Sequence, residues 1–382
     1  MSLNDTFTST GSKFFAHEEA MTKLRNGKGQ PIVTHIMLTD VCNHKCAFCS
    51  VQKRAGDSLQ FLVVQAYLGI LYQYGLKAVI LSGGGNPILY KCKHSGADFN
   101  DVVDFCHKLG LEIGLITNGM TLKEYDKAGR RTWKTVKTST LDKLTWIRIS
   151  MSGLDHEENE VYVPDIDSSK TTLGFSYVAH DIYKEPKDPH HGKVSRRLDL
   201  ISGDKRRSAD LYFEERINDL TNDFTSYIRK YNPKYLRLLP NCLEPNLISF
   251  RVKQLKQICS NVNSVVEKQV AFVQNKPPKA PHACYLGYIH PVLNCDGYVY
   301  PCDSCVLNET AEHQFANPWR ICKWDEIGKL YEKPVRSLIK DPSKLCPGCV
   351  FHQSNEILEG VVEGIIDTTP TQLHQLEHIN FV

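Results

Sequence analysis

Ile32-Val33-Thr34-His35-Ile36-Met37-Leu38 leads into Cys42-Asn43-His44-Lys45-Cys46-Ala47-Phe48-Cys49, and these two stretches decide the fold. The first is apolar and rich in β-branched residues, so it predicts a buried strand. The second places three cysteines at the spacing C-x3-C-x2-C on the loop after that strand. A closed structural site needs four protein ligands. Three cysteines therefore predict an inorganic centre with one open coordination position, where chemistry can occur.

Composition is that of a globular protein with one large domain and a smaller one. The chain has 382 residues, of which 41% are hydrophobic and 23% are charged. No apolar run approaches the roughly 20 residues that span a bilayer, and the polar N-terminus lacks the apolar core of a signal peptide. Fourteen cysteines in such a chain favour metal or cluster ligation over disulfides. We therefore expect a cytoplasmic protein without a membrane partner.

Strand-like and helix-like segments alternate after the cysteine loop. Strands are expected at 78–81, 112–116, 146–149, 172–178 and 235–240, and helices at 59–74, 99–109, just before 144, and 217–231. Strands separated by helices form right-handed units around a parallel sheet. The polar segment 181–210 interrupts this rhythm, and we expect it to be a long surface loop or lid.

Three consecutive glycines follow the strand at 78–81. Gly83-Gly84-Gly85 lets the backbone approach a ligand closely, and Asn86 comes next. Asn118 and Ser150 end the strands at 112–116 and 146–149, where parallel barrels carry their functional groups. Turn capping explains both polar residues equally well.

Two arginines lie inside otherwise apolar strands. Arg148 interrupts the strand at 146–149, and Arg237 interrupts the strand at 235–240. A charged side chain in such a position needs a partner or a polar cavity. A structural salt bridge and an anion site are both consistent with the sequence.

A second group of cysteines lies in the C-terminal part of the chain. Asp296-Gly297 is a hairpin signal that would fold Cys302 back toward Cys284, and Cys346-Pro347-Gly348-Cys349 brings two thiolates into one turn. Four thiolates in two pairs make a closed site that suits zinc or an iron–sulfur cluster. Three further cysteines could replace an assigned ligand or belong to another site: Cys295, Cys305 and Cys322.

The first cysteine motif, with Phe48 just before its last cysteine, resembles that of the radical S-adenosylmethionine (SAM) superfamily. The resemblance implies that Cys42, Cys46 and Cys49 are catalytic ligands of a [4Fe-4S] cluster whose fourth iron binds SAM. Reductive cleavage of SAM then yields a 5′-deoxyadenosyl radical that removes a hydrogen atom from the substrate. The implied fold is α/β, a partial (β/α)6 TIM-like barrel. A chance triplet or part of a zinc site is the alternative.

The same resemblance implies a set of contacts with SAM. The acidic residue that usually follows the glycines is absent, so backbone carbonyls are expected to hold the amino group of SAM. Asn118 and Ser150 correspond to contacts with its ribose or carboxylate, and Arg237 is a candidate for the carboxylate or for a substrate anion. The cofactor-binding residues implied in this way are Phe48, Gly83, Gly84, Gly85, Asn86, Asn118, Ser150 and Arg237.

Cys284-x12-Gly297-x4-Cys302 followed by Cys346-x2-Cys349 resembles the SPASM/twitch extensions of radical SAM enzymes. This implies an auxiliary [4Fe-4S] cluster on Cys284, Cys302, Cys346 and Cys349. The shorter twitch form fits better, because the C-x2-C-x5-C-x3-C run of a full SPASM domain is missing. The expected organisation is an arm over 1–30, a barrel over 31–240 with the insertion 181–210, and a linker helix with the auxiliary domain over 241–382.

The resemblance implies an oxidoreductase or modifying enzyme that acts on a small molecule or a peptide. A reducing partner such as flavodoxin or ferredoxin would supply electrons. Basic clusters in the insertion are also consistent with a radical SAM enzyme that modifies a nucleotide or a nucleic-acid base. A nucleic-acid partner is not favoured, because the net charge is only +3. A non-enzymatic binding protein stabilised by zinc or a cluster is the remaining alternative. The sequence does not name the substrate.

Overall fold

One curved sheet organises the structure. The computed structural model describes residues 2–9, 11–46, 48–49, 51, 54–119, 136–155, 160–180, 203–243, 245–275, 277, 279–304, 317–367 and 377–382. The ten strands in this part of the chain follow the order β10-β9-β8-β1-β2-β3-β4-β5-β6-β7. The first six in sequence are parallel neighbours: β1 (Val33–Ile36), β2 (Ala78–Leu81), β3 (Glu112–Thr117), β4 (Trp146–Ser150), β5 (Thr172–Ala179) and β6 (Tyr235–Pro240).

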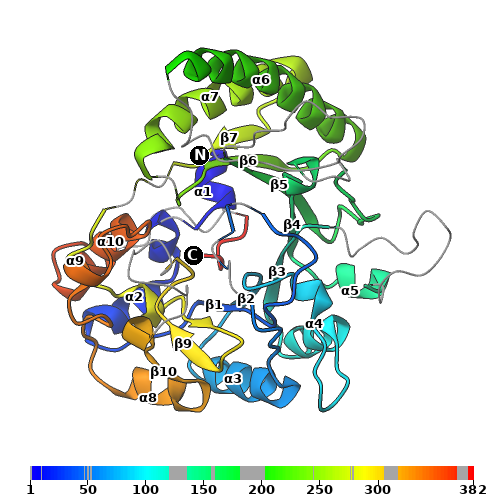
Figure 1. Cartoon of the computed structure of the whole chain (residues 1–382). Coiled ribbons are helices and arrows are strands. Elements are labelled where there is room, and N and C mark those ends of the chain that lie inside the picture. Colours follow the sequence, from blue (N-terminus) through cyan, green and yellow to red (C-terminus); the bar gives the residue numbers. More distant parts are fainter. Residues whose placement is uncertain are drawn as a thin grey trace.

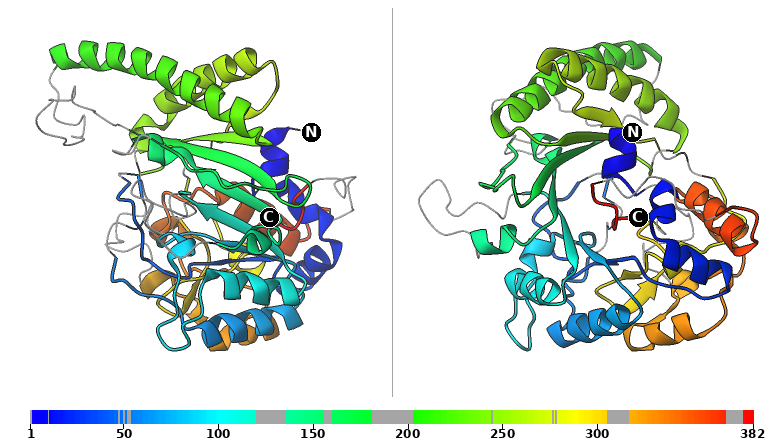
Figure 2. Two further views of the ribbon diagram at one scale, coloured as in Figure 1. Left: turned by 90° about the vertical axis from the view of Figure 1, so that its right-hand side faces the viewer. Right: turned by 180° about the vertical axis from the view of Figure 1, so that it is seen from behind.

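Helices cover the convex side of this sheet, and they follow the strands as expected (Figures 1 and 2). Between β1 and β7 they are α3 (Phe61–Gln73), α4 (Phe99–Lys108), α5 (Thr138–Leu141), α6 (Gly203–Tyr231) and α7 (Ile248–Val266). The curved parallel sheet with helices outside confirms the expected α/β fold of a partial TIM-like barrel.

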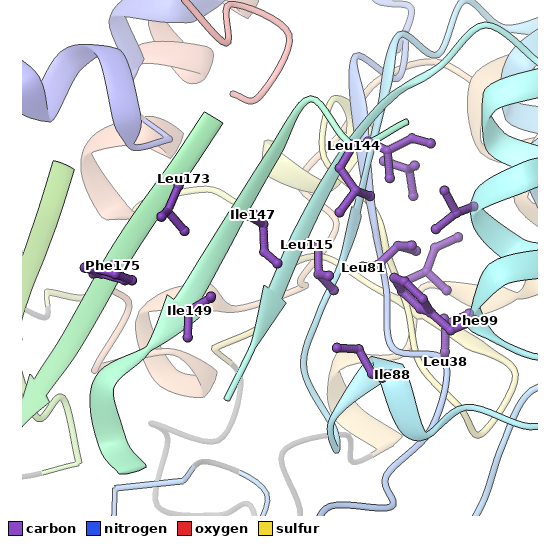
Figure 3. Packing of buried hydrophobic residues seen from close by; sticks show 14 of the residues in the cluster. Leu38, Leu81, Ile88, Phe99, Leu115, Leu144, Ile147, Ile149, Leu173 and Phe175 are labelled. Atoms are coloured by element: carbon purple, nitrogen blue, oxygen red, sulfur yellow. The ribbon is translucent and has the colours of Figure 1, made fainter. Parts of the chain in front are cut away.

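The core lies between the sheet and these helices. Leu115, Ile147 and Phe175 point outward from β3, β4 and β5 and are fully buried. Figure 3 shows them in one cluster with side chains such as Phe99 of α4. Each such side chain contributes roughly 1.5–3 kcal/mol through burial. This packing fixes the sheet, and with it the positions of the loops at its carboxyl edge.

The concave face is different, because polar side chains near the carboxyl ends of its strands are only partly buried. Successive residues of a strand point to opposite faces, so the positions that alternate with the core residues face the barrel interior. Asn118, Ser150, Ser176 and Arg237 belong to this set, and all four are half-buried. Ser150, Ser176 and Arg237 lie at one level of the sheet. The polar ends of the strands therefore surround a partly open interior.

The sheet continues beyond β6 on one edge and beyond β1 on the other. β7 (Ala271–Val273) adds to β6 in parallel, and β8 (Val292–Leu293) adds to β1 in parallel. β9 (Tyr298–Tyr300) and β10 (Cys322–Lys323) follow as antiparallel strands. The Asp296-Gly297 hairpin is confirmed, because Val292 pairs with Tyr300 and Gly297 has a φ of +79°. The cysteine-rich segment is thus hydrogen-bonded to the barrel.

The polar insertion is shorter than predicted. Residues 203–210 are the first turns of α6 rather than part of a loop. This stretch, GDKRRSAD, has good helix formers in Lys, Arg and Ala, but it lacks the apolar spacing on which the prediction relied. Residues 181–202, with the His190-His191 pair and Arg196-Arg197, lie outside the described residues.

The two ends of the chain meet at the open side of the barrel. The N-terminal arm contains α1 (Leu3–Phe7) and α2 (Glu18–Arg25), and α2 buries Met21 and Leu24 beside α10 (His352–Val362). The C-terminus lies in the centre of the curved sheet (Figures 1 and 2), where Val382 is buried. The remaining helices are α8 (Ile327–Glu332) and α9 (Pro342–Leu345). No helix in the described ranges is long and apolar enough to cross a bilayer.

Candidate active site

The three cysteines of the first motif lie together on the loop after β1. The Cys49 N–H donates to the Cys46 carbonyl at 3.1 Å, which turns the loop back on itself. Burial raises the pKa of the Cys46 thiol to about 12, and the thiols of Cys49 and Cys42 add to this rise. The hydroxyl of Ser152 acts in the opposite direction through a hydrogen bond to Cys46. The three sulfur atoms are thus close enough to influence one another.

Hydrogen-bond donors surround the sulfur atoms. Arg54 reaches Cys49 Sγ at 3.3 Å and also donates to the His44 carbonyl at 2.9 Å. The Val51 N–H donates to Cys49 Sγ at 3.4 Å, and the amide of Asn118 lies 3.9 Å from Cys42 Sγ. Donors of this kind favour thiolates, and they stabilise a negatively charged centre bound to them.

The glycine turn packs directly on the backbone that leads into Cys42. Gly85 N–H donates to the Thr39 carbonyl and Asn86 N–H to the Val41 carbonyl, both at 2.8 Å. A Cβ atom on Gly84 would stand 2.8 Å from the Thr39 oxygen, and one on Gly85 would stand 1.9 Å from the Val41 oxygen. The glycines are therefore required for this close approach, and the two N–H groups are already used. A contact of the turn with SAM through its carbonyls stays a prediction.

A chain of amides joins the strand ends to the cysteine loop. Asn86 donates to Asn118 at 3.0 Å, and Asn118 donates to Asn43 at 3.0 Å. Thr117 holds the oxygen of Asn86 at 2.9 Å. Because Asn43 directly follows Cys42, this network fixes the thiol loop against β2 and β3.

The structure also places the remaining predicted SAM contacts. Ser150 donates to Ser152 at 3.1 Å, so it is connected to Cys46 through one hydroxyl. The ring of Phe48 packs against His180 with centroids 4.7 Å apart. Arg237 instead lines a cavity inside the barrel. Asn118 and Ser150 thus come together with the cysteines, whereas Arg237 lies in the cavity.

Sequence reasoning missed four residues around the thiols. Asn43 lies inside the quoted cysteine stretch, and Thr117 and Ser152 lie next to the predicted residues Asn118 and Ser150. A search for polar neighbours of the predicted residues would have found these three. Arg54 follows the motif by five residues, and no spacing rule pointed to it.

The second group of cysteines is also compact. The thiol of Cys284 is buried, and its pKa is raised by this burial and then by Cys302, Cys349 and Cys346. Burial raises the pKa of Cys346 to about 11, and Cys302 adds to the rise. Cys284 packs in one cluster with Met37, which follows β1. The four cysteines that the sequence paired are therefore neighbours.

The other C-terminal cysteines have different neighbours. Burial raises the pKa of Cys295 to about 12, with a contribution from Asp40. Burial likewise raises the pKa of Cys322 to about 12, with a contribution from Glu326. Neither thiol is among the neighbours that act on Cys284. Cys305 lies outside the described residues.

The donor sets can be compared with the groups that they would hold. Within the described ranges, no set of three or more His, Cys, Asp or Glu side chains is arranged to hold a metal ion. A four-iron cubane is larger than a single ion, so its cysteine ligands stand further apart than those of zinc. Three thiols and four thiols are the numbers that an open and a closed cubane require. Both groups therefore fit a [4Fe-4S] cluster by donor type and number.

A cavity of about 130 Å³ lies in the barrel interior. Arg148 of β4 and Arg237 of β6 line it from the sheet, and Lys13 lines it from the N-terminal arm. Asp303 directly follows Cys302, and Phe351 lies two residues after Cys349. These two residues complete the wall on the side of the second cysteine group. The cavity thus separates the sheet from that group.

Residues 36–166 match the family model described as the Radical SAM superfamily. Curated relatives named GTP 3′,8-cyclase also match. The one from Staphylococcus epidermidis is 32% identical over 110 residues, which are 26% of this chain and 31% of the relative. The one from Aquifex aeolicus is 31% identical over 139 residues, which are 34% of this chain and 38% of the relative. The match spans about a third of the length of these relatives.

Solved structures show more distant likenesses. SuiB of Streptococcus suis, bound to its precursor peptide SuiA, has a TM-score of 0.47 and 14% identity, covering 83% of this chain and 68% of SuiB. A structure described as native anSMEcpe with bound AdoMet and the Cp18Cys peptide has a TM-score of 0.44 and 15% identity, covering 88% of this chain and 100% of anSMEcpe. At these TM-scores the likeness supports no argument about site or substrate. The family match covers residues 36–166, which include the three-thiol loop, so this part of the chain is similar to the Radical SAM superfamily.

Proposed function

We propose that this protein cleaves SAM reductively at Cys42, Cys46 and Cys49 and removes a hydrogen atom from a small molecule or a peptide. The observation that carries the proposal is the convergence of these three thiols beside Asn118 and Ser150 at the carboxyl edge of the sheet. A [4Fe-4S] cluster held there would supply the electron that splits SAM into methionine and a 5′-deoxyadenosyl radical.

The chain's own residues prepare this site. Arg54 and the Val51 N–H donate to the sulfur of Cys49, and the amide of Asn118 points a donor at the sulfur of Cys42. Partial burial of the loop restricts water near Cys46. The remaining contacts with SAM that we propose come from Phe48, the carbonyls of Gly83, Gly84 and Gly85, the side chain of Asn86, and Ser150.

We further propose that Cys284, Cys302, Cys346 and Cys349 hold an auxiliary [4Fe-4S] cluster. Their mutual proximity supports this assignment. Four protein ligands leave no iron open, so such a cluster would accept an electron from the substrate rather than bind the substrate. Asp303 follows Cys302, Phe351 lies two residues after Cys349, and both line the barrel cavity, which supports a substrate position in that cavity beside this group.

The proposed organisation is an arm over 1–30, a barrel over 31–240 and an auxiliary domain over 241–382. The proposed reducing partner is a flavodoxin or a ferredoxin, and the proposed compartment is the cytoplasm. A nucleotide is the second candidate substrate. Two observations favour it: the relatives named GTP 3′,8-cyclase and the two arginines in the cavity wall.

The test is anaerobic incubation of the iron-loaded protein with SAM and dithionite. Formation of 5′-deoxyadenosine is expected in the unchanged protein and is expected to fall to background in Cys46→Ala. Cys242→Ala serves as the matched control, because Cys242 is half-buried, follows β6 and belongs to neither cysteine group. Intact SAM after incubation with protein that retains its iron would contradict the proposal.

A further inference from the structure

The barrel cavity contains two arginines that form no ion pair with any carboxylate of the described residues. Among the described residues, no Asp or Glu forms an ion pair with Arg148 or Arg237. Asp303 is the acidic residue of the cavity wall, and its nearer carboxylate oxygen lies 3.7 Å from His35 Nδ1. Guanidinium groups in such a setting are costly unless an anion completes the site.

The surroundings of Arg148 hold it in place and leave donors available. Its Nε donates to the hydroxyl of Tyr235 at 3.1 Å. Its guanidinium carbon lies 5.1 Å from the centroid of the Trp146 ring and 5.9 Å from that of the Tyr235 ring. Aromatic faces fix a guanidinium plane without neutralising its charge. Arg148 is therefore positioned, while its terminal nitrogens keep their donors for a ligand.

Arg237 stands two residues nearer the carboxyl edge. Arg148 of β4 pairs with Gly174 of β5, and Gly174 pairs with Tyr235 of β6. Arg237 lies two residues after Tyr235 on the same strand. Its Nε is buried and has no hydrogen-bond partner. Burial, and then the positive charge of Arg148, lower the pKa of Arg237 to about 9, while Asp303 acts in the opposite direction. Arg148 and Arg237 thus repel each other, and among the described residues Asp303 is the cavity carboxylate that acts against this on Arg237.

Lys13 lines the same cavity but is already satisfied. Its Nζ donates to the carbonyls of Thr6, His378 and Phe381 at 2.8, 3.1 and 3.3 Å. All of its donors are therefore used to hold the two ends of the chain together. This separates Lys13 from Arg148 and Arg237, which have donors to offer.

We propose that Arg148 and Arg237 form a subsite for an oxyanion, a carboxylate or a phosphate, that the substrate of this enzyme carries. The inference rests on the proposed function and names the substrate class. Paired guanidinium groups bind such oxyanions through several parallel N–H···O bonds. The cavity of about 130 Å³ suits one anionic group, because sites for whole drug-sized ligands measure about 300–1,000 Å³.

SAM also carries a carboxylate, so the anion at the two arginines could come from SAM or from the substrate. The residues that line the cavity distinguish these two possibilities. None of the cysteines of the first motif, the glycine turn, Asn118 or Ser150 is among the described residues that line it. The wall instead contains Asp303 and Phe351, which are close in sequence to Cys302 and Cys349 of the second cysteine group. The subsite therefore belongs to a substrate lying between the two cysteine groups.

The experiment is anaerobic calorimetry on the iron-loaded protein, with inorganic phosphate and SAM as separate titrants. We expect saturable phosphate binding that weakens at least tenfold in Arg237→Gln and in Arg148→Gln, with a larger loss for phosphate than for SAM. Arg229→Gln is the matched control, because Arg229 is a cation of α6 whose side chain donates to the Val265 carbonyl outside the cavity. It should leave both affinities unchanged.

The inference would be overturned if the unchanged protein did not bind phosphate, or if both Gln variants kept the phosphate affinity of the unchanged protein. An equal loss of SAM affinity in these variants would also overturn it, because the two arginines would then bind the carboxylate of SAM. Arg148→Lys and Arg237→Lys keep the charge but not the planar fork, and they are compared in the same way if a Gln variant does not fold. Formation of 5′-deoxyadenosine is measured in parallel, so failure of the proposed function is seen independently of phosphate binding.

Discussion

Arg54 carries a positive charge to the sulfur of a predicted cluster ligand. Its removal in Arg54→Gln takes away a charge-assisted hydrogen bond to Cys49 Sγ. A loss of about 1 kcal/mol corresponds to roughly 40 mV for one electron. We expect the reduction potential of the iron–sulfur centre to become more negative by about this amount, because the reduced, more negative form loses a donor. A spectroscopically monitored redox titration measures the shift, and Arg229→Gln should leave the potential unaltered.

Lys13 gives the stability of the fold a pH dependence. Burial, and then the charge of Arg148, lowers the pKa of Lys13 from 10.5 to about 7 in the folded protein. Between these two values the unfolded chain binds the extra proton, so the free energy of unfolding should rise with pH by up to about 1.4 kcal/mol per unit. Denaturant unfolding at pH 7, 8 and 9 measures this slope. Lys13→Met should reduce it, and an equal slope in both proteins would contradict the assignment.

At this scale the sequence indicated which cysteines lie together better than it indicated the polar residues around them. The cysteines could be predicted because thiolates at short, regular spacings have few other uses. Asn43 and Ser152 could be found only as polar neighbours of the predicted residues, and no spacing rule pointed to Arg54. Arg237 shows the same limit: its strand was predicted, but its place in the cavity beside Arg148 depends on the curvature of the sheet.

The glycine turn after β2 is the element most sensitive to added volume. Gly85→Ala would place a methyl group against the Val41 carbonyl oxygen, which holds the backbone of the thiol loop. We expect a destabilisation of roughly 1–3 kcal/mol and a reduced iron content, because the turn and the loop must separate. Thermal unfolding and iron analysis measure both effects.

Gly69→Ala is the matched substitution on an element away from the site. Gly69 lies within α3, and a Cβ atom there meets nothing within 4 Å. It should stabilise the protein by up to about 1 kcal/mol through helix propensity and leave the iron content unaltered. Equal effects of the two substitutions would remove the argument that Gly85 is required by close packing.

Elements with a strong apolar pattern could be predicted almost to the residue. β2 occupies 78–81 and β6 occupies 235–240 as expected, because buried strands of a parallel sheet are continuous apolar runs. β7 has three residues and pairs with β6 at the edge of the sheet. A strand this short has no sequence pattern from which it could be predicted. The start of α6 was missed for a similar reason, since its first turns carry charged residues.

The whole molecule should contain two iron–sulfur clusters. About eight irons per chain are expected after anaerobic reconstitution, and Cys284→Ala should lower this to about four while 5′-deoxyadenosine still forms. Cys322→Ala is the control, because Cys322 pairs in β10 and lies apart from Cys284. Zinc in place of iron, or an equal loss in both variants, would contradict the assignment of the second group.

The pairing of β8 with β1 has a consequence for the whole molecule. The main-chain N–H groups of His35 and Met37 donate to the carbonyls of Pro291 and Leu293. β1, which leads to the first cysteine motif, is therefore hydrogen-bonded to β8, which leads to the second cysteine group. An electron passing between the two centres would therefore cross a gap of constant width throughout turnover, and its tunnelling rate would be set once, by folding.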